Sequence, residues 1–420
     1  MLLTGIWGLT KGDGRSHKGP SHGGGPARGA FGQKIVATVR YGRQPDHQRH
    51  SLGKDRVQMK LADYANGRDN NLNLLRMLAA FGVLVSHAYP IALGPDAVQP
   101  LVSWLGMSLG SVCVYIFFII SGFLITQSFE RSRNIHYWAA GRVLRLFPAL
   151  IVVVLLTALL LGPAVTTLSS AQYFRDPSVG TYVLRNIALV SLQYELPGVF
   201  ETNPYGGAIN GSLWTLVHEA ACYTFVLLCG VLGFLGSPRR LLVFLVISFA
   251  GFVLLEAMAW REHLHDKIAA FLRLAVPFGV GMALYALRRW LPLSPLMGLV
   301  LLPVCALAYP TLVGFVAFNL CLGYWVFLLA YLPSGRIRAY NRVGDYSYGI
   351  YIYAFPAQQL SMFLFPGLTP LENVLIAGPV TLGLAALSWY LVEKPSLGRK
   401  EALGATLTDM ASRAKPAKRS

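Results

Sequence analysis

The segment that decides the fold reads Asn71-Leu-Asn-Leu-Leu-Arg76-Met-Leu-Ala-Ala-Phe-Gly-Val-Leu-Val-Ser-His87-Ala-Tyr-Pro90. It is mostly apolar and reaches the length of about 20 residues with which a helix crosses a bilayer. Eleven helical steps of about 100° bring His87 onto the face that also holds Arg76, roughly 16 Å along the axis. We therefore expect Arg76 near one membrane surface and His87 inside the bilayer.

His87 is the first candidate functional residue of the chain. An ionisable side chain at this depth is costly, so a role in function is the default hypothesis. The alternative is a structural histidine that makes a hydrogen bond between helices. This segment alone leaves both interpretations open.

The composition extends the membrane interpretation to most of the chain. Of the 420 residues, 54% are hydrophobic and 13% are charged, which is too apolar for a soluble protein of this length. Hydrophobic stretches of spanning length predict an all-α integral membrane protein with about ten transmembrane helices. These lie at residues 72–93, 104–127, 143–162, 212–235, 240–259, 269–287, 294–309, 311–332, 346–365 and 373–392.

The distribution of basic residues predicts the orientation of these spans. The net charge of +17 is concentrated in both tails and in alternate loops, as the positive-inside rule requires. This pattern predicts that both termini are cytoplasmic. It also indicates that the basic residues serve membrane topology and do not bind nucleic acid. The basic loop clusters are Arg131, Arg133, Arg142 and Arg145; Arg239 and Arg240; Arg288 and Arg289; and Arg336, Arg338 and Arg342.

The chain divides into a membrane domain, residues 71–395, and two basic tails that we expect to be disordered, residues 1–70 and 396–420. The N-terminal tail either rests on the anionic cytoplasmic leaflet or includes a start-site extension, residues 1–58, before Met59. The five cysteines lie within spans without metal-ligand spacing, so we expect packing roles for them and no bound metal.

Residues 163–210 form the large loop predicted on the non-cytoplasmic side. Its aromatic side chains alternate with hydrogen-bonding groups, a mixture that suits carbohydrate. An interfacial aromatic belt explains the same residues. The residues in question are Tyr173, Phe174, Arg175, Asp176, Tyr182, Tyr194, Glu195, Phe200, Glu201 and Tyr205.

The fourth span supplies a candidate partner for His87. It begins Asn210-Gly-Ser-Leu-Trp-Thr-Leu-Val-His218-Glu219, which puts Glu219 about 13 Å below its outer end. His87 lies about 8 Å below the outer boundary of a roughly 30 Å core, a comparable depth. The two could form a hydrogen-bonded dyad or a structural ion pair. His218 points about 100° away from Glu219 and is secondary.

Arginines at the cytoplasmic helix ends form a candidate anion site. Arg142 and Arg145 lie on one helix face, and Arg76 enters from the same side. The planar guanidinium suits phosphate, so these residues are candidates to bind a phosphorylated donor. A purely topological role is the alternative.

The ninth span begins with a polar stretch at Gly344. Ser347, Tyr348 and Tyr351 fall on neighbouring helical positions and form either a polar seam or hydrogen bonds between helices. Glu393, at the end of the tenth span, is expected to make a structural pair with a cytoplasmic arginine.

Taken together, the motifs resemble those of the acyltransferase-3 family of bacterial membrane acyltransferases, the O-antigen and exopolysaccharide O-acetylase type, over residues 72–395. Each motif is weak alone, but six in order are specific. They are Arg76 with His87, Ser121-Gly122-Phe123-Leu124, Arg142 with Arg145 before Pro148, Ser212-Leu213-Trp214 through Glu219, Gly344-Asp345 with Ser347-Tyr348, and Glu393-Lys394-Pro395. The chain departs from the family at Ala354, where many members have a histidine, and at His218.

The resemblance implies an inner-membrane enzyme that moves an acyl group, expected to be acetyl, from acetyl-CoA to a hydroxyl of a surface or lipid-linked glycan. It makes His87 and Glu219 the catalytic candidates, with Arg76, Arg142 and Arg145 for coenzyme A. We assign substrate contacts to Trp214, Tyr348 and Tyr351. His87 acts as a base or carries the acyl group. A proton-coupled transporter, and a lipid or small-molecule acceptor, are the alternatives; the oligomeric state is left open.

Overall fold

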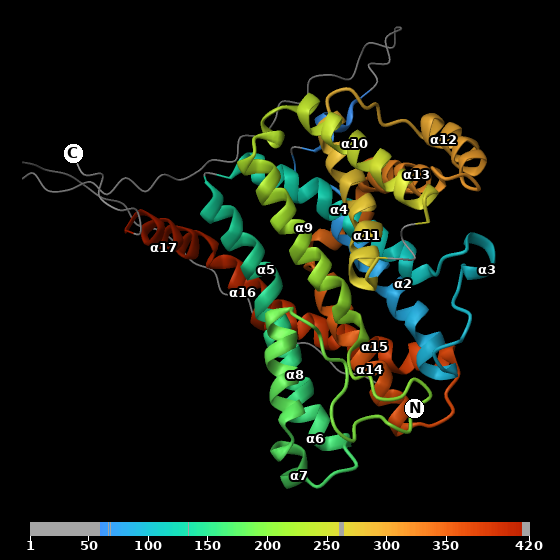
Figure 1. Cartoon of the computed structure of the whole chain (residues 1–420), viewed down its shortest axis with the longest axis vertical. Helices are drawn as coiled ribbons and strands as arrows, with labels where there is room; N and C mark the ends of the chain where they lie inside the picture. The colour runs from blue at the N-terminus through green and yellow to red at the C-terminus, as the bar shows by residue number, and fades with distance from the viewer. Residues whose placement is uncertain (1–58, 66, 68, 133, 260–263, 414–420) are drawn as a thin grey trace, which may run out of the picture. The chain divides into compact units, whose positions relative to one another are not determined.

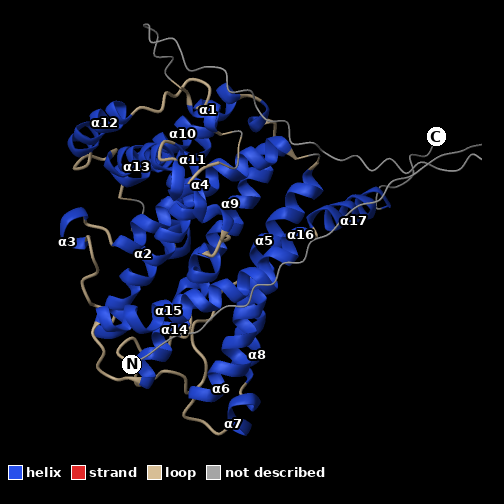
Figure 2. Cartoon of the chain, turned by 180° about the vertical axis from the view of Figure 1, so that it is seen from behind, coloured by secondary structure: helices blue, strands red, loops and turns tan. Residues whose placement is uncertain are grey.

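The computed structural model describes residues 59–65, 67, 69–132, 134–259 and 264–413. The predicted tail 1–58, with the question of its start site, lies outside these residues. In the described part the regular structure is helical and contains no strand (Figures 1 and 2). This confirms the all-α prediction.

Within the described residues, eight helical stretches are long and apolar enough to cross a membrane. Multi-pass membrane architecture is thereby confirmed. The stretches contain α2 (Leu72–Leu93), α4 (Leu109–Arg131), α5 (Ile135–Leu156) with η1 (Thr157–Leu161) and α6 (Gly162–Val165), η2 (Gly211–Leu213) with α9 (Trp214–Val231), α10 (Pro238–Ala257), α11 (Asp266–Leu287), α13 (Gly314–Tyr331), and α15 (Pro370–Ser388) with η6 (Trp389–Glu393) and α16 (Lys394–Gly398).

The other two predicted spans coincide with α12 (Pro295–Ala308), which has 14 residues, and with α14 (Ser347–Leu364). The count of ten spans and the cytoplasmic placement of both termini therefore stay predictions. The remaining short helices are α1 (Leu61–Tyr64), α3 (Val102–Leu105), α7 (Ser170–Arg175), α8 (Pro177–Ala188), η3 (Phe234–Gly236), η5 (Gly335–Arg342) and α17 (Lys400–Arg413).

Helix α14 is polar because protein surrounds it. Fifteen of its 18 residues are buried, and it packs between α2 and α15. Its Gln358 side chain donates hydrogen bonds to the Leu84 carbonyl oxygen and to Asn373 Oδ1, both at 2.9 Å. Polar groups at membrane depth are tolerated when they face the bundle and find partners there. This helix can therefore bring hydroxyl groups into the centre of the protein.

Helices α4 and α11 cross at glycines, and this crossing explains one sequence motif. A Cβ atom at Gly122 would overlap the backbone oxygen of Phe278, and one at Gly281 would overlap that of Ile119. Small residues let membrane helices approach to backbone contact. Gly122 of the Ser-Gly-Phe-Leu stretch is therefore a packing residue.

The loop 163–210 contains two helices that the sequence interpretation missed, α7 and α8. Their tyrosines are core residues: Tyr173 donates a hydrogen bond to the Ala158 carbonyl oxygen at 2.8 Å, and Tyr182 shares one with Thr157 at 3.1 Å. Neither residue takes part in sugar stacking or in an interfacial belt. The sequence does contain a helix-start signal for α8. Asp176 is the N-cap and accepts from the Ser178 amide, and Pro177 is the first helical residue.

Ordered structure also extends beyond both predicted boundaries of the membrane domain. Helix α17 lies within the predicted disordered tail 396–420 and packs on α5, where Gly404 meets the Tyr137 ring. The structure thus has helices in residues 396–413, where the sequence predicted disorder, and residues 414–420 lie outside the described part. At the other end, the buried Leu61 of α1 donates its amide to the Leu291 carbonyl oxygen at 2.9 Å, so order begins before residue 71.

Candidate active site

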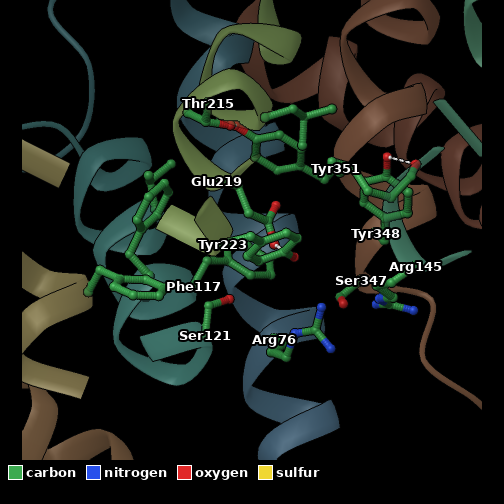
Figure 3. A pocket seen from close by; sticks show the side chains of 15 residues that line it. Arg76, Phe117, Ser121, Arg145, Thr215, Glu219, Tyr223, Ser347, Tyr348 and Tyr351 are labelled. Atoms are coloured by element: carbon green, nitrogen blue, oxygen red, sulfur yellow. Dashed lines mark hydrogen bonds between the residues drawn. The ribbon is translucent and has the colours of Figure 1, made fainter. Parts of the chain in front are cut away.

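A narrow inner cavity, with a volume of about 50 Å³ that water can reach, lies where α2, α4, α5, α9, α11 and α14 meet. Figure 3 shows arginines at one end of this cavity and the pair of Thr215 and Tyr351 at the other, with Glu219 and Tyr223 between them. The polar side chains that line it are Arg76, Ser121, Arg145, Thr215, Glu219, Tyr223, Ser347, Tyr348 and Tyr351.

Two of the predicted anion-binding arginines converge on one carboxylate. Arg76 and Arg145 donate to the same oxygen of Asp345, at 2.5 and 2.7 Å. We call these three residues the arginine–aspartate cluster. Burial alone would raise the pKa of the Asp345 carboxyl, but the guanidinium groups of Arg145 and Arg76 hold this pKa below its ordinary value. Asp345 is therefore a carboxylate, and it neutralises charge that the sequence interpretation assigned to a ligand.

Local sequence fixes the position of Asp345. Its second oxygen accepts from the Ser347 hydroxyl at 2.6 Å and from the Ser347 amide at 3.3 Å, at the start of α14. Gly344 precedes it with φ at +136°, and a Cβ there would meet the Trp389 ring. Glycine is the residue that adopts this conformation without strain. The Gly-Asp and Ser-Tyr pairs therefore form one turn, which positions the Asp345 carboxylate against the arginines.

Glu393 makes the ion pair that we predicted for it. Its side chain is 2% exposed, lies 3.3 Å from Arg145 and accepts a hydrogen bond from Ser388 at 3.0 Å. It belongs to η6, a single π-helical turn that interrupts the end of α15. Such turns occur often at functional sites. Arg145 is thus held by two carboxylates.

Arg142 differs from the other two arginines. Its guanidinium lies over the ring of Tyr223, at 5.9 Å from the ring centre, and its buried Nε has no hydrogen-bond partner. Tyr223 in turn donates a hydrogen bond of 2.5 Å to Glu219. Within the part of the chain that the structure describes, Arg142 has no carboxylate within ion-pair distance. Of the three predicted anion-binding arginines, it is the one that no carboxylate of the described residues compensates.

His87 borders a different space. This outer cavity has a volume of about 620 Å³ and includes Gln99, Trp214, Arg273 and Tyr351 in its lining. The His87 ring is partly exposed and makes an edge contact with Phe355 at 5.6 Å, while its buried Nδ1 has no hydrogen-bond partner. The predicted structural role as an interhelical hydrogen bond is therefore not observed for Nδ1.

The predicted direct dyad between His87 and Glu219 is not formed. Among the described residues no hydrogen bond joins them, and Glu219 accepts from Tyr223 instead. They line separate cavities that share the walls Val114 and Tyr351. The sequence estimate was of depth along each helix, and depth does not fix the direction in which a side chain points around the helix axis.

The three predicted substrate-contacting residues lie on the cavities. Tyr351 lines both and shares a hydrogen bond of 2.5 Å with Thr215. Tyr348 lines the inner cavity and donates to the Leu146 carbonyl oxygen at 2.7 Å, so the tyrosines serve as both seam and interhelical bonds. Trp214 lines the outer cavity. His218, predicted to be secondary, contacts the Trp214 carbonyl oxygen at 2.9 Å, away from Glu219.

Sequence reasoning missed two residues of this site as site residues, Asp345 and Tyr223. Asp345 had a signal, because an aspartate two residues before a serine at a helix start is a common capping arrangement. Tyr223 had a weaker one, its position one helical turn after Glu219. No group of three or more potential metal ligands occurs in the described residues, and the absence of a metal stays a prediction.

Comparison with known proteins gives three matches. The model of a family described as an acyltransferase domain matches residues 69–392. An O-acetyl transferase of Shigella phage Sf6 is 29% identical over 346 residues, which cover 79% of this chain and 97% of the relative. Nodulation protein 10 of Rhizobium leguminosarum bv. viciae is 29% identical over 365 residues, which cover 81% of this chain and 96% of the relative. No solved structure matches significantly.

Proposed function

The chain belongs to the family of the acyltransferase domain, and from this premise we propose that it transfers an acetyl group from acetyl-CoA to a hydroxyl of a surface or exported glycan. Membership makes it a membrane acyltransferase and decides against the transporter alternative. The observation that carries the finer proposal is the pair of adjoining cavities, one near the arginines and one bordered by His87, with Tyr351 in both linings.

The arginine end suits the phosphates of coenzyme A as the donor. Arg142 has an unused Nε, and Arg76 gives only one of its five N–H groups to Asp345. Charge-assisted bonds from arginine to phosphate are short and strong. Because Asp345 and Glu393 compensate Arg76 and Arg145, we propose that directed hydrogen bonds, led by Arg142, bind the donor rather than a net positive charge.

The acetyl group would then lie along the inner cavity, with its thioester toward Tyr351. A sugar hydroxyl in the outer cavity attacks the thioester carbonyl carbon; a C–O bond forms and the C–S bond breaks. An alcohol is a weak nucleophile at neutral pH, so a base must take its proton. We assign this to His87, which afterwards gives the proton to the departing thiolate. Transfer through an acetyl-histidine uses the same residue and remains the second route.

Glu219 has a different role in this proposal from the one that the sequence suggested. Its carboxylate orients the Tyr223 hydroxyl and, through that ring, the guanidinium of Arg142. We therefore propose that Glu219 is a positioning residue for the donor end of the inner cavity, and that it does not act on His87 directly.

The acetyl group and the oxygen acceptor are supported by the O-acetyl transferase relative, and the glycan by the family resemblance. The inner membrane is proposed from the family resemblance and from the alternating basic loops. A lipid or small-molecule acceptor is the other candidate.

The test uses purified protein in nanodiscs, acetyl-CoA labelled in its acetyl group, and deacetylated surface polysaccharide of the host. We expect label in the polysaccharide with the wild type, none above background with His87→Ala, and normal transfer with His136→Ala, a control at the opposite end of the bundle. Label in extracted lipid instead would refute the glycan acceptor. Activity of His87→Ala would remove His87 from the chemistry.

A further inference from the structure

The outer cavity borders two more cavities, with which it shares lining residues. It shares Trp214 with an aromatic pocket that Tyr194 and Tyr205 also line, of about 520 Å³. It shares Met107 and Arg273 with a cavity beside Trp104, of about 920 Å³. A pocket for a drug-sized ligand measures about 300–1,000 Å³, so this row has room for more than one sugar.

We propose that these three spaces form one extended saccharide-binding cleft, so that the acceptor is a chain of several sugars and His87 faces an internal unit. This inference rests on the proposed function for the chemical class of the acceptor. It adds that several sugars of the acceptor are bound, and it names the residues that contact the sugars on either side of the reacting one.

The aromatic pocket has the composition of a sugar subsite. Tyr194 and Trp214 are each 37% exposed, and they come from different segments, the loop after α8 and the first turn of α9. The amide of Ile209 donates to the Tyr194 carbonyl oxygen at 2.8 Å and fixes that loop. The apolar C–H face of a sugar packs on flat rings, while its hydroxyl groups donate to an acid such as Glu195, which also lines the pocket.

A single ring joins this pocket to His87. Phe355 makes an edge contact with Tyr205 at 5.7 Å and with His87 at 5.6 Å. Both residues touch the same ring, so the aromatic pocket and His87 lie one aromatic ring apart. The pocket is therefore placed to hold the unit next to the one that is acylated.

The third cavity, beside Trp104, offers a second aromatic face and a cation. Trp104, in α3, is 86% exposed beside this cavity. Arg273 lines both this cavity and the outer cavity. Its guanidinium donates a hydrogen bond to the Tyr115 hydroxyl at 3.3 Å and lies 4.8 Å from the centre of the Phe315 ring. Its remaining N–H groups can donate to sugar hydroxyls or to the carboxylate of an acidic sugar.

An interfacial belt of aromatic residues would explain Trp104 alone. It does not explain why Tyr194, Tyr205 and Trp214 converge on one concave pocket that borders the outer cavity at Trp214. Belt residues project outward to the headgroups, whereas these rings share an indentation with the carboxylate of Glu195. Convergence on a cavity is the feature that points to a ligand.

The experiment measures acetyl transfer to size-separated fragments of deacetylated host polysaccharide, from one sugar to several repeating units. For the wild type we expect the acceptor KM to fall at least tenfold from the single sugar to the longest fragment. Tyr194→Ala and Trp104→Ala should each remove most of this gain, by about tenfold in acceptor KM, and leave the KM for acetyl-CoA unchanged. Phe174→Ala and Trp290→Ala are the matched controls; both residues are exposed and line none of the three cavities.

Equal KM values for all fragment lengths would overturn the cleft and leave the glycan transferase proposal intact. If the acceptor KM falls with fragment length but the aromatic variants do not change this fall, the longer acceptor binds elsewhere. That result would also overturn the cleft. Transfer to no saccharide of any length, with label in lipid or a small molecule, would defeat the proposed function itself.

Discussion

The exchange Asp345→Asn tests whether the arginine–aspartate cluster holds the donor end of the bundle together. Asp345 is 11% exposed and receives ion pairs from Arg76 at 2.5 Å and from Arg145 at 2.7 Å. Asparagine keeps the shape but removes the charge, so the partly buried guanidinium groups of Arg76 and Arg145 lose the carboxylate that they share. Loss of one partner from a buried pair costs about 3–5 kcal/mol. Since Glu393 still pairs with Arg145, we expect a loss near the lower limit, about 3 kcal/mol.

The assay is thermal unfolding of the detergent-solubilised protein, followed by the recovery of monodisperse protein in size-exclusion chromatography. Asp345→Asn should lower the midpoint by several degrees, while Asp409→Asn, on the exposed side of α17, should not. Glu393→Gln should fall between them, because Arg145 keeps its bond to Asp345. Equal midpoints for Asp345→Asn and Asp409→Asn would refute the structural role of the cluster.

The lowered pKa of the Asp345 carboxyl predicts how the destabilisation by Asp345→Asn depends on pH. Its pKa in the folded protein is below the ordinary value of about 3.9, because the two guanidinium groups outweigh the effect of burial. A group whose pKa is lowered on folding stabilises the fold fully at pH values above its ordinary pKa, and this stabilisation is lost as the pH falls through the lower pKa of the folded protein. The deficit of Asp345→Asn should therefore be constant from pH 7 to pH 5. A deficit that disappears within that range would contradict the assigned charge state.

Three further predictions concern single contacts. Gly122→Leu forces a side chain into the Phe278 backbone and should abolish accumulation of folded protein in membranes, whereas Gly180→Ala, with open space around it, should not; normal levels of the first would refute the close crossing of α4 and α11. Arg142→Ala should raise the KM for acetyl-CoA at least tenfold with little change in acceptor KM, and an unchanged KM would leave Arg142 a topological role. Glu219→Ala and Tyr223→Phe remove the same hydrogen bond, so the double variant should lose little more turnover than either single one; fully additive losses would mean that the two act separately.

Much of the fold followed from the sequence because membrane helices are specified locally. Apolar runs of spanning length predicted α2, α4 and α9, and each of the other predicted spans also coincides with a helix. Helix α17 was missed because it is too polar for a span and lies in a tail that is basic as a whole. It is held by a distant partner, the ring of Tyr137, against which Gly404 packs, and no local pattern reports such a contact.

The candidate site was predicted residue by residue but not pair by pair. Arg76, His87 and Glu219 could be chosen because charged groups are conspicuous in apolar helices. Their partners could not, since Asp345 lies 269 residues from Arg76 along the chain. The direction of Glu219 around its helix was equally beyond reach. It depends on how α9 is rotated against α5 and α14, which packing decides.

The most direct test of the central claim is the O-acetyl content of surface and secreted glycans, measured by NMR in a deletion strain that carries either the wild-type chain or His87→Ala at equal membrane levels. We predict that the acetyl signals vanish on deletion, return with the wild type and stay absent with His87→Ala. Signals that survive the deletion, or that return with His87→Ala, would contradict the claim that this chain acetylates glycans through His87.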